Sequence, residues 1–133
     1  MASIKPIIYL ATPYSHECEK VMQLRADMVS EYSARQTKLG YVVFSPITHS
    51  HELAKYGTPT SWAFWSQIDY VFLQHCDYFV RLWVPGVKTS VGVNGEIALC
   101  EELGIPIYTA RWDEDLDAIL PKAVRDSAKV RVH

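Results

Sequence analysis

The sequence of 133 residues predicts an α/β fold in which a central parallel sheet of four to five strands lies between two layers of helices. Two observations predict it. Short runs rich in β-branched and aromatic residues alternate with longer segments of helical periodicity, and this alternation repeats at least three times. Such repetition is typical of a parallel sheet with helices on both faces. No linker or internal repeat interrupts the chain, so we expect residues 1–133 to form a single domain.

The first half of the chain begins with a compact apolar run, "IKPIIYLA" (residues 4–11), which predicts a strand followed by the turn "TPYSH". Apolar residues at spacings of three and four then predict a helix over residues 17–39, which Gly40 ends. The residues of this apolar stripe are Val21, Leu24, Met28 and Tyr32. A second strand is expected at residues 41–45, followed by an irregular polar stretch at 46–60.

The second half continues the alternation. A helix, a strand, a helix and a strand are expected at residues 61–76, 78–83, 90–104 and 106–110, respectively. Thr60 or Ser61 caps the first of these helices, and Gly104 closes the second. The acidic stretch that follows predicts a short helix that Pro121 ends or kinks. The tail "SAKVRVH" is expected either to fray or to form a last edge strand.

The predicted fold is a three-layer sandwich of the flavodoxin-like or Rossmann-like kind. In such folds ligands bind outside the carboxyl ends of the strands, where the strand order reverses. The segments after the first three strands, "TPYSH", "SPITHSHE" and "WVPGVKTSVG", are therefore expected to line one pocket. They are also the loops richest in hydroxyl groups, histidines and glycines. From the first segment we expect Thr12, Pro13 and Tyr14 to contact a ligand.

The motif "TSVGVNGE" (residues 89–96) starts the helix after the third strand. Glycine costs about 1 kcal/mol relative to alanine inside a helix, yet two glycines precede Glu96 here. Helical side chains lean toward the N-terminus, so Glu96 lies over Gly92, where a missing side chain leaves room for a molecule. Alternatively, the glycines form a tightly packed cap and Glu96 is solvated. Thr89 or Ser90 caps the helix, whose free N–H groups attract anions.

A second carboxylate, Asp69, shares a helix face with Trp65 and Phe72. Desolvation there is expected to raise the pKa of Asp69 and to favour the protonated acid. Cleavage of a glycosidic bond needs one protonated carboxyl to assist the leaving group and one ionised carboxylate at the anomeric carbon. Alternatively, Asp69 is an ordinary surface residue. Asp77, just past the helix, is a third candidate, or it caps the entrance of the next strand.

Five stretches together resemble the nucleoside 2-deoxyribosyltransferase superfamily, including its 2′-deoxynucleoside 5′-phosphate N-hydrolases. They are "IIYLATPYS", "GYVVFSPI", "DYVFLQHCDYFV", "SVGVNGE" and "ALCEELGIPIY". The segment "FSPITHSHE" is similar to a small bacterial and phage branch without an assigned activity. The resemblance covers roughly residues 4–110. Its most specific parts are the S-x-G-x-x-x-E element and the tyrosine of the first strand.

This resemblance implies roles for individual residues. Glu96 matches the nucleophile that forms a covalent deoxyribosyl ester, and Asp69 matches the acid that assists departure of the base. Tyr9 matches a tyrosine that contacts the site near the nucleophile. Ser90 matches a hydroxyl that binds the 5′-phosphate in the monophosphate hydrolases, and Asp77 fits their second aspartate.

The sequence departs from those hydrolases after the first strand. "TPYSH" stands where they carry a glycine- and arginine-rich turn, so an arginine expected to touch phosphate is missing. Arg25 and Lys88 are the candidates to replace it, unless both are ordinary solvated charges. The residues therefore leave open whether the substrate carries a 5′-phosphate.

Histidines and aromatic residues offer further candidates. His49 and His51 would point to the same side of an extended segment, which suits a metal, but no third ligand has a matching spacing. We therefore expect no metal and no cofactor, and we expect His49 to line the base or sugar pocket. Tyr14, Trp62 and Trp65 are candidates to stack on a nucleobase, or the tryptophans belong to the core or to a subunit contact.

Composition limits the possible partners. The net charge is −2 and no basic stripe is present, so neither a nucleic acid polymer nor an anionic membrane is an expected partner. The three cysteines are widely spaced, which indicates a reducing compartment. The N-terminal apolar run is too short for a signal peptide, and no stretch is long enough to span a bilayer. We expect a soluble, cytoplasmic protein.

Together these features predict an N-glycosidase that acts on deoxyribonucleosides or their 5′-monophosphates, with hydrolysis favoured over base transfer. The alternative is a non-catalytic nucleotide-binding or sensing module on the same fold. A flavin-binding domain is disfavoured, because no phosphate loop rich in serine and threonine follows the first strand. Related enzymes are dimers or larger, so we expect a homodimer or higher homo-oligomer that uses the aromatic helix at 61–76 as a contact surface.

Overall fold

The computed structural model describes residues 4–131 of the chain. Its centre is a sheet of four parallel strands in the order β2-β1-β3-β4. The strands are β1 (Ile8–Ala11), β2 (Val43–Phe44), β3 (Tyr78–Trp83) and β4 (Ile107–Arg111). The predicted α/β class and the parallel sheet are thereby confirmed, with strands one and two shorter than expected.

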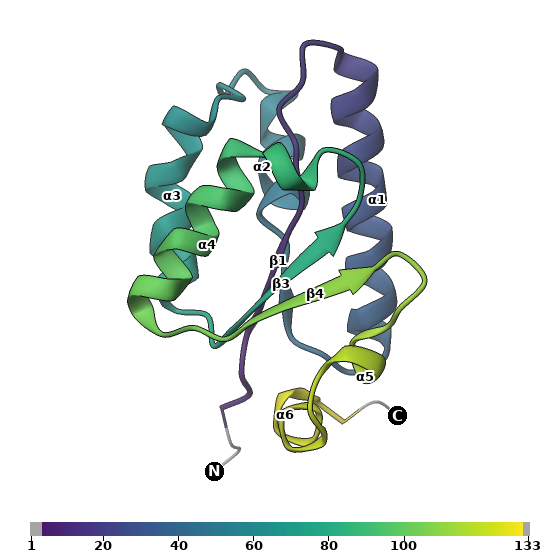
Figure 1. The fold of residues 1–133 in the computed structure, drawn as a ribbon. Coiled ribbons are helices and arrows are strands. Elements are labelled where there is room, and N and C mark those ends of the chain that lie inside the picture. Colours follow the sequence, from purple (N-terminus) through teal and green to yellow (C-terminus); the bar gives the residue numbers. More distant parts are fainter. Residues whose placement is uncertain (1–3, 132–133) are drawn as a thin grey trace.

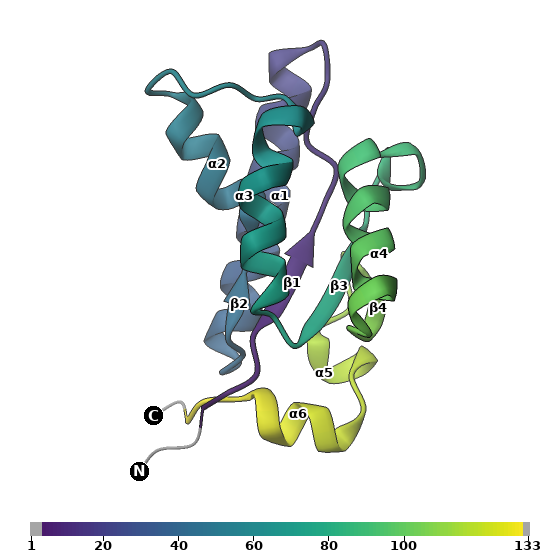
Figure 2. The ribbon, with the colours of Figure 1, turned by 90° about the vertical axis from the view of Figure 1, so that its left-hand side faces the viewer.

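Helices cover both faces of the sheet, as Figures 1 and 2 show. Helices α3 (Trp62–Gln74) and α4 (Val91–Leu103) pack on one face, and α1 (Glu19–Lys38) and α5 (Leu116–Ile119) pack on the other. Helix α6 (Lys122–Ala128) lies below the amino ends of the strands (Figure 1). Within residues 4–131, no helix combines the length and the apolar character needed to cross a bilayer.

Strand β1 divides the core into two halves, because side chains alternate across a strand. Ile8 and Leu10 face α1 and α5, whereas Tyr9 and Ala11 face α3 and α4. All four side chains are buried. The central strand therefore needs apolar residues on both faces, which is the compact run that the sequence displays.

The buried face of α1 differs from the predicted apolar stripe. Its buried residues are Ala26, Val29, Tyr32 and Gln36. Leu24, which belonged to the predicted stripe, is exposed. Gln36 is buried because its side chain has partners: Oε1 accepts from Leu116 N at 2.9 Å, and Nε2 donates to Asp115 Oδ1 at 2.9 Å. The predicted stripe is confirmed at Tyr32 and at Met28, which packs against the core, and is wrong at Leu24. Gln36 was missed because hydropathy does not register a polar side chain whose hydrogen bonds are satisfied.

The irregular stretch predicted at residues 46–60 is wrong in its first half, where the chain forms α2 (Pro46–Ala54). Ser45 caps this helix by accepting from Thr48 N, and Pro46 occupies the first helical position. Proline is favoured there because its missing N–H is not needed. Serine followed by proline was therefore a helix-start signal, despite the polar residues that follow.

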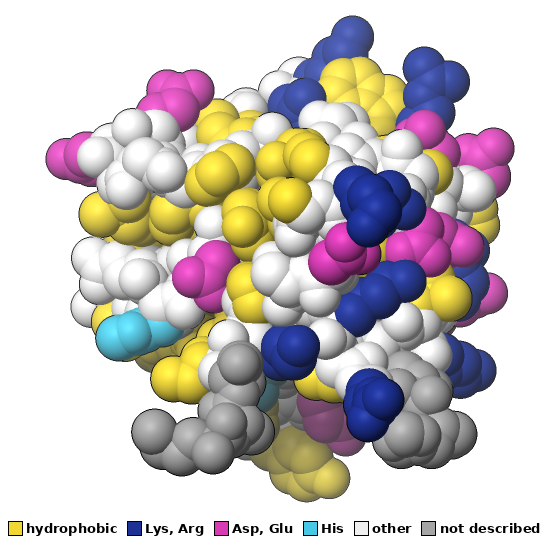
Figure 3. Space-filling model, turned by 90° about the horizontal axis from the view of Figure 1, so that it is seen from below, with side chains coloured by type: hydrophobic (Ala, Val, Ile, Leu, Met, Phe, Trp, Pro, Cys, Tyr) yellow, Lys and Arg dark blue, Asp and Glu magenta, His cyan; other side chains and the backbone are white. Residues whose placement is uncertain are grey.

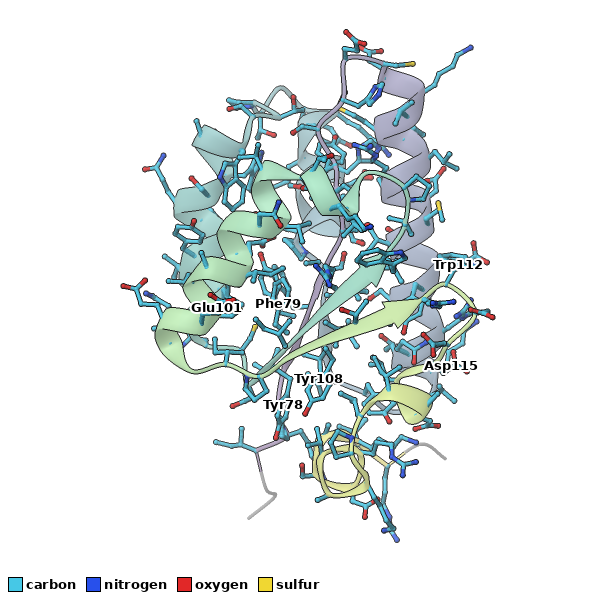
Figure 4. The ribbon with its side chains drawn as sticks, in the orientation of Figure 1. Tyr78, Phe79, Glu101, Tyr108, Trp112 and Asp115 are labelled. Atoms are coloured by element: carbon cyan, nitrogen blue, oxygen red, sulfur yellow. The ribbon has the colours of Figure 1, made fainter. Side chains whose placement is uncertain are left out.

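Up to residue 131 the C-terminal segment adds no fifth strand, and the last two residues of the predicted tail lie outside the described residues. Pro121 separates α5 from α6, and beyond α6 an isolated bridge joins Lys129 to Tyr41. The segment after β4 rests against α1, where Arg35 donates to the carbonyl of Trp112 at 2.7 Å. Figure 4 shows Trp112 and Asp115 beside that helix. On the face that carries the amino ends of the strands, acidic and basic side chains intermix (Figure 3), so no single sign of charge gathers there.

The strand order places a reversal between β1 and β3. The chain passes from β1 outward to β2 and then returns to the other side of β1 for β3 and β4. The helices that follow β1 and β3 therefore lie on opposite faces, and their starts diverge above the carboxyl ends of these strands (Figure 2). This is where a ligand site is expected in an open parallel sheet.

Candidate functional site

A cavity of about 330 Å³ lies at this reversal. Its walls come from the three segments that the sequence predicted to line one pocket, together with the start of α3 and Arg25 of α1. The lining residues include Thr12, Pro13, Tyr14, Ser15 and His16 after β1, Pro46 and Ile47 after β2, and Gly86 and residues 89–93 after β3. The predicted location of the pocket is confirmed. Its volume lies in the range of small-molecule sites.

Two carboxylates from different helices line this cavity. Glu96 projects from α4 and Asp69 from α3, and the side chains are 4% and 5% exposed. They are 27 positions apart in the sequence, and the contact between α3 and α4 brings them together. Both side chains therefore lie in the wall of the same cavity.

Tyr9 reaches Glu96 from beneath the cavity. Its side chain is fully buried, and its hydroxyl donates to Glu96 Oε2. The rings of Phe44 and Phe79 flank the tyrosine ring, with centroids at 5.9 and 5.7 Å. Because aromatic packing holds the ring and the hydroxyl holds one oxygen, the carboxylate of Glu96 is fixed in position with its Oε1 left for another partner.

Burial changes the acidity of both carboxyl groups. Desolvation raises the pKa of Glu96 to about 8, with a further increase from neighbouring Asp69 and an opposing effect of the Tyr9 hydroxyl. Desolvation raises the pKa of Asp69 to about 6. The expected rise at Asp69 is present, and the rise at Glu96 is larger. Burial therefore raises the pKa of both carboxyl groups, whereas the sequence predicted a raised pKa only for Asp69.

The two glycines before Glu96 leave less open space than predicted. A Cβ at Gly92 would lie 3.2 Å from Cε3 of Trp62, and a Cβ at Gly95 would lie 3.0 Å from Cζ2 of the same ring. The indole of Trp62 thus occupies the room that the glycines create, and this ring in turn lines the cavity. The correction concerns what fills the space: an aromatic wall, rather than a void above Glu96.

Arg25 joins the cavity from α1, and the chain makes room for it at Gly86. A Cβ at Gly86 would lie 2.5 Å from Nη2 of Arg25, and the φ angle of +93° there also favours glycine. Nη1 of Arg25 donates to the carbonyl of Ser15 at 3.0 Å. Of the two cations considered to replace the missing arginine, Arg25 lines the cavity, whereas Lys88 lies 5.4 Å from the ring centroid of Trp83, outside it.

Caps and hydroxyl groups surround the mouth of the cavity. Ser90 caps α4 by accepting from Val93 N at 3.2 Å, and Ser61 caps α3 by accepting from Phe64 N at 3.3 Å. Both serines line the cavity, so the positive ends of the two helices are directed toward it. The hydroxyl of Thr12 is buried and has no hydrogen-bond partner within residues 4–131, which leaves it available to a ligand.

Two predicted binding residues lie elsewhere. Asp77 accepts from Ile7 N at 2.8 Å, so it caps the entrance of β1 and not that of the following strand, β3, which was the alternative considered for it. His49 packs against the rings of Trp65 and Phe72, with centroids at 6.0 and 6.1 Å, and it does not line the cavity. The segment is helical, so residues two apart do not share a face and the expected common direction of His49 and His51 is wrong.

Ser15 and Ser61 also line the cavity, although neither was predicted as a ligand contact. Their serine side chains in turns and caps give no signal beyond local structure. No group of three or more histidine, cysteine, aspartate or glutamate side chains that would suit a metal occurs in the described part of the chain.

Known proteins match this chain both in sequence and in structure. The sequence profile of the family described as domain of unknown function (DUF1937) matches residues 6–114. The structure resembles that of a 2-deoxyribosyltransferase from the psychrotolerant bacterium Bacillus psychrosaccharolyticus, with a TM-score of 0.53 and 17% sequence identity over 91% of this chain and 81% of that chain. At this identity the similarity shows a shared fold. No curated protein matches the sequence.

Proposed function

We propose that this protein, which belongs to the family described as domain of unknown function (DUF1937), is an N-glycosidase. Its substrates would be deoxyribonucleosides or their 5′-monophosphates, cleaved at the bond between base and sugar. One observation carries the proposal: Glu96 and Asp69, from different helices, are both buried in the wall of one cavity. The name of the structural neighbour, a 2-deoxyribosyltransferase, supports a nucleoside as substrate.

The reaction would proceed by double displacement. Oε1 of ionised Glu96 attacks C1′ of the sugar while the bond from C1′ to the base nitrogen breaks. The electron pair of that bond stays on the base, which takes the proton of the Asp69 carboxyl group. A sugar ester of Glu96 remains. Water, deprotonated by Asp69, then attacks C1′ and releases Glu96 as a carboxylate, or a second base attacks and gives transfer. We favour water as the acceptor.

Tyr9 would prepare Glu96 for this attack. Its hydroxyl bond lowers the pKa of Glu96 against the effect of burial, and it occupies Oε2, which directs Oε1 toward the sugar. The positive charge that develops at C1′ would lower the pKa of Glu96 further, because an opposite charge nearby favours the ionised form. As the bond from C1′ to the base breaks, the form with Glu96 ionised and the proton on Asp69 would therefore be the reactive one.

Two features of the cavity bear on the 5′-phosphate. Arg25 and the capped start of α4 place donors and positive charge on the cavity wall, which favours a phosphorylated substrate.

A homodimer or larger assembly remains our expectation, and the exposed side chains of Phe64, Val71 and Phe72 on α3 are the surface proposed for it.

The proposal is tested by incubating the protein with each common deoxynucleoside and its 5′-monophosphate and measuring free base by chromatography. We expect base release by the wild type and none by Glu96→Gln, while Glu102→Gln, an exposed carboxylate on the same helix, retains activity. Acid quenching followed by peptide mass spectrometry is expected to find one deoxyribosyl group on the peptide that holds Glu96. Ligands that raise the melting temperature without any base release would instead establish the non-catalytic module.

A further inference from the structure

A chain of hydrogen bonds leads from the cavity wall to the surface through four side chains. The hydroxyl of Tyr14, which lines the cavity, bonds to Nδ1 of His51 at 2.8 Å. Nε2 of His51 bonds to Oε1 of Gln23 at 3.0 Å, and Nε2 of Gln23 donates to Oδ1 of Asp27 at 2.8 Å. The chain joins the loop after β1 to α2 and α1, and the mechanism proposed above uses none of it.

The polarity of this chain follows from its outer end. An ionised carboxylate accepts hydrogen bonds and cannot donate them, so Asp27 requires the amide nitrogen of Gln23 to face it. Oε1 of Gln23 must then face His51, where it accepts from Nε2–H. A neutral imidazole carries a proton on only one nitrogen, so Nδ1 of His51 is the acceptor. Tyr14 must therefore donate its hydroxyl proton to His51.

The consequence lies in the cavity. With its proton directed at His51, the oxygen of Tyr14 offers only lone pairs to a bound molecule. Nη1 of Arg25 lies 3.4 Å from the backbone carbonyl of Tyr14, and the rings of Tyr14 and His51 pack edge to face with centroids at 5.5 Å. Both the backbone and the ring of this tyrosine are therefore held, and its oxygen is a fixed acceptor.

From this geometry we propose that Tyr14 is a specificity-determining residue that accepts a hydrogen bond from an O–H or N–H group of the substrate, with His51 as the positioning residue that fixes its polarity. The nature of the substrate rests on the proposed function. Three groups of a nucleoside supply such a donor: the 3′-hydroxyl, the 5′-hydroxyl and an exocyclic amino group of the base. The shared chemistry is donation to a fixed oxygen, and a bare carbonyl at that place would meet a second acceptor.

The test combines one variant with matched ligands. Wild type and Tyr14→Phe are compared on the best nucleoside of the panel and on three analogues, each lacking one of the three donors. We expect Tyr14→Phe to lower kcat/KM about five- to tenfold on the intact nucleoside, as the loss of one hydrogen bond predicts. On the analogue that lacks the recognised donor the two proteins should be equal. An equal loss on the intact nucleoside and on all analogues overturns the proposal.

The role of His51 has its own readout. His51→Phe removes the acceptor for the Tyr14 proton and should reduce the discrimination between the intact nucleoside and the critical analogue, whereas His51→Gln, which retains an acceptor oxygen, should restore part of it. Nitrogen-15 NMR of the wild-type protein should show the proton of neutral His51 on Nε2. A proton on Nδ1 would contradict the proposal without any assay of activity.

Failure of this proposal and failure of the proposed function are separable. If the wild type releases no base, the affinities of Tyr14→Phe and wild type for the same ligands are compared by calorimetry, and they should again be equal for one analogue. That result would contradict only the proposed glycosidase activity. If base is released and the ratio of kcat/KM between Tyr14→Phe and wild type is the same on every analogue, only the role of Tyr14 is contradicted. If the protein neither binds these ligands nor releases base, both proposals are overturned.

Discussion

Replacing Glu96 by glutamine should stabilise the protein, and the gain should grow with pH. The variant retains the shape of the side chain and an oxygen that can accept from Tyr9, but it removes a carboxyl group that is buried among α3, α4 and β1. A buried group with a raised pKa resists ionisation, so its charge weighs against the folded state. The residue proposed as nucleophile is thus expected to reduce stability.

The magnitude follows from linkage. The pKa of Glu96 is about 8 in the folded protein, against an ordinary value of 4.5. Because the folded pKa is the higher one, the stability held by the protonated group is fully present below pH 4.5 and is lost as pH rises through 8. Each pKa unit corresponds to about 1.4 kcal/mol, so Glu96→Gln should gain about 3 kcal/mol at pH 7 and about 5 kcal/mol above pH 8. The gain at pH 5 should be about 1 kcal/mol or less.

Urea denaturation of wild type and variant at pH 5, 7 and 9 measures this difference, with no substrate needed. Glu102→Gln is the matched control, since it removes an exposed carboxylate from the same helix and should leave the difference near zero at each pH. A stability difference between Glu96→Gln and wild type that does not change with pH would refute the reasoning. A variant less stable than wild type at pH 9 would refute it more strongly.

Three other predictions concern the same cavity. The profile of kcat/KM against pH should be bell-shaped with limbs near pH 6 and 8, the pKa values of the two carboxyl groups, and Tyr9→Phe should move the alkaline limb upward because it removes the bond that lowers the pKa of Glu96. If the alkaline limb of Tyr9→Phe does not move, the Tyr9 hydroxyl does not control the ionisation of Glu96. Gly95→Ala should destabilise the fold by about 1 kcal/mol in urea denaturation, because its Cβ would meet an indole at 3.0 Å and a tyrosine hydroxyl at 3.3 Å; a gain from helix propensity would show that the aromatic pair yields. Arg25→Met should raise KM for 5′-monophosphates about tenfold or more while changing KM for nucleosides little, as expected when a charged hydrogen bond is lost. Lys20→Met, exposed on the same helix, is its control, and an equal change for both substrate classes would exclude a phosphate contact.

The sequence predicted most of the fold because the signals for it are local. Glycine ends α1 and serine caps α4, and the compact apolar runs form strands where expected. The errors have local causes as well. The polar content of residues 46–54 concealed a helix that Ser45 and Pro46 begin. On α1, Gln36 is buried with its hydrogen bonds satisfied, whereas Leu24 of the predicted apolar stripe is exposed.

The sequence predicted which residues line the candidate site better than it predicted which side chains these residues contact. Glu96 and Asp69 stood out as carboxylates beside glycines and aromatic residues, and the rule for parallel sheets placed the pocket above β1 and β3. That Trp62 fills the room beside Gly92 was not predictable, because spacing within one helix says nothing about which side chain of the next helix approaches it.

By itself, therefore, the sequence determined the order of the elements, the parallel sheet and the edge of the sheet at which the cavity lies, since hydrophobic periodicity, caps and the connection rules act over a few neighbouring residues. Only the tertiary structure decided which side chains meet there. The bond of Tyr9 to Glu96, the seat of Arg25 against Gly86 and the path from Tyr14 through His51 to Gln23 each join segments far apart in the chain. Burial between packed elements also set the acidity of Glu96, because a pKa depends on what excludes water from the group, and that is a property of the assembled fold.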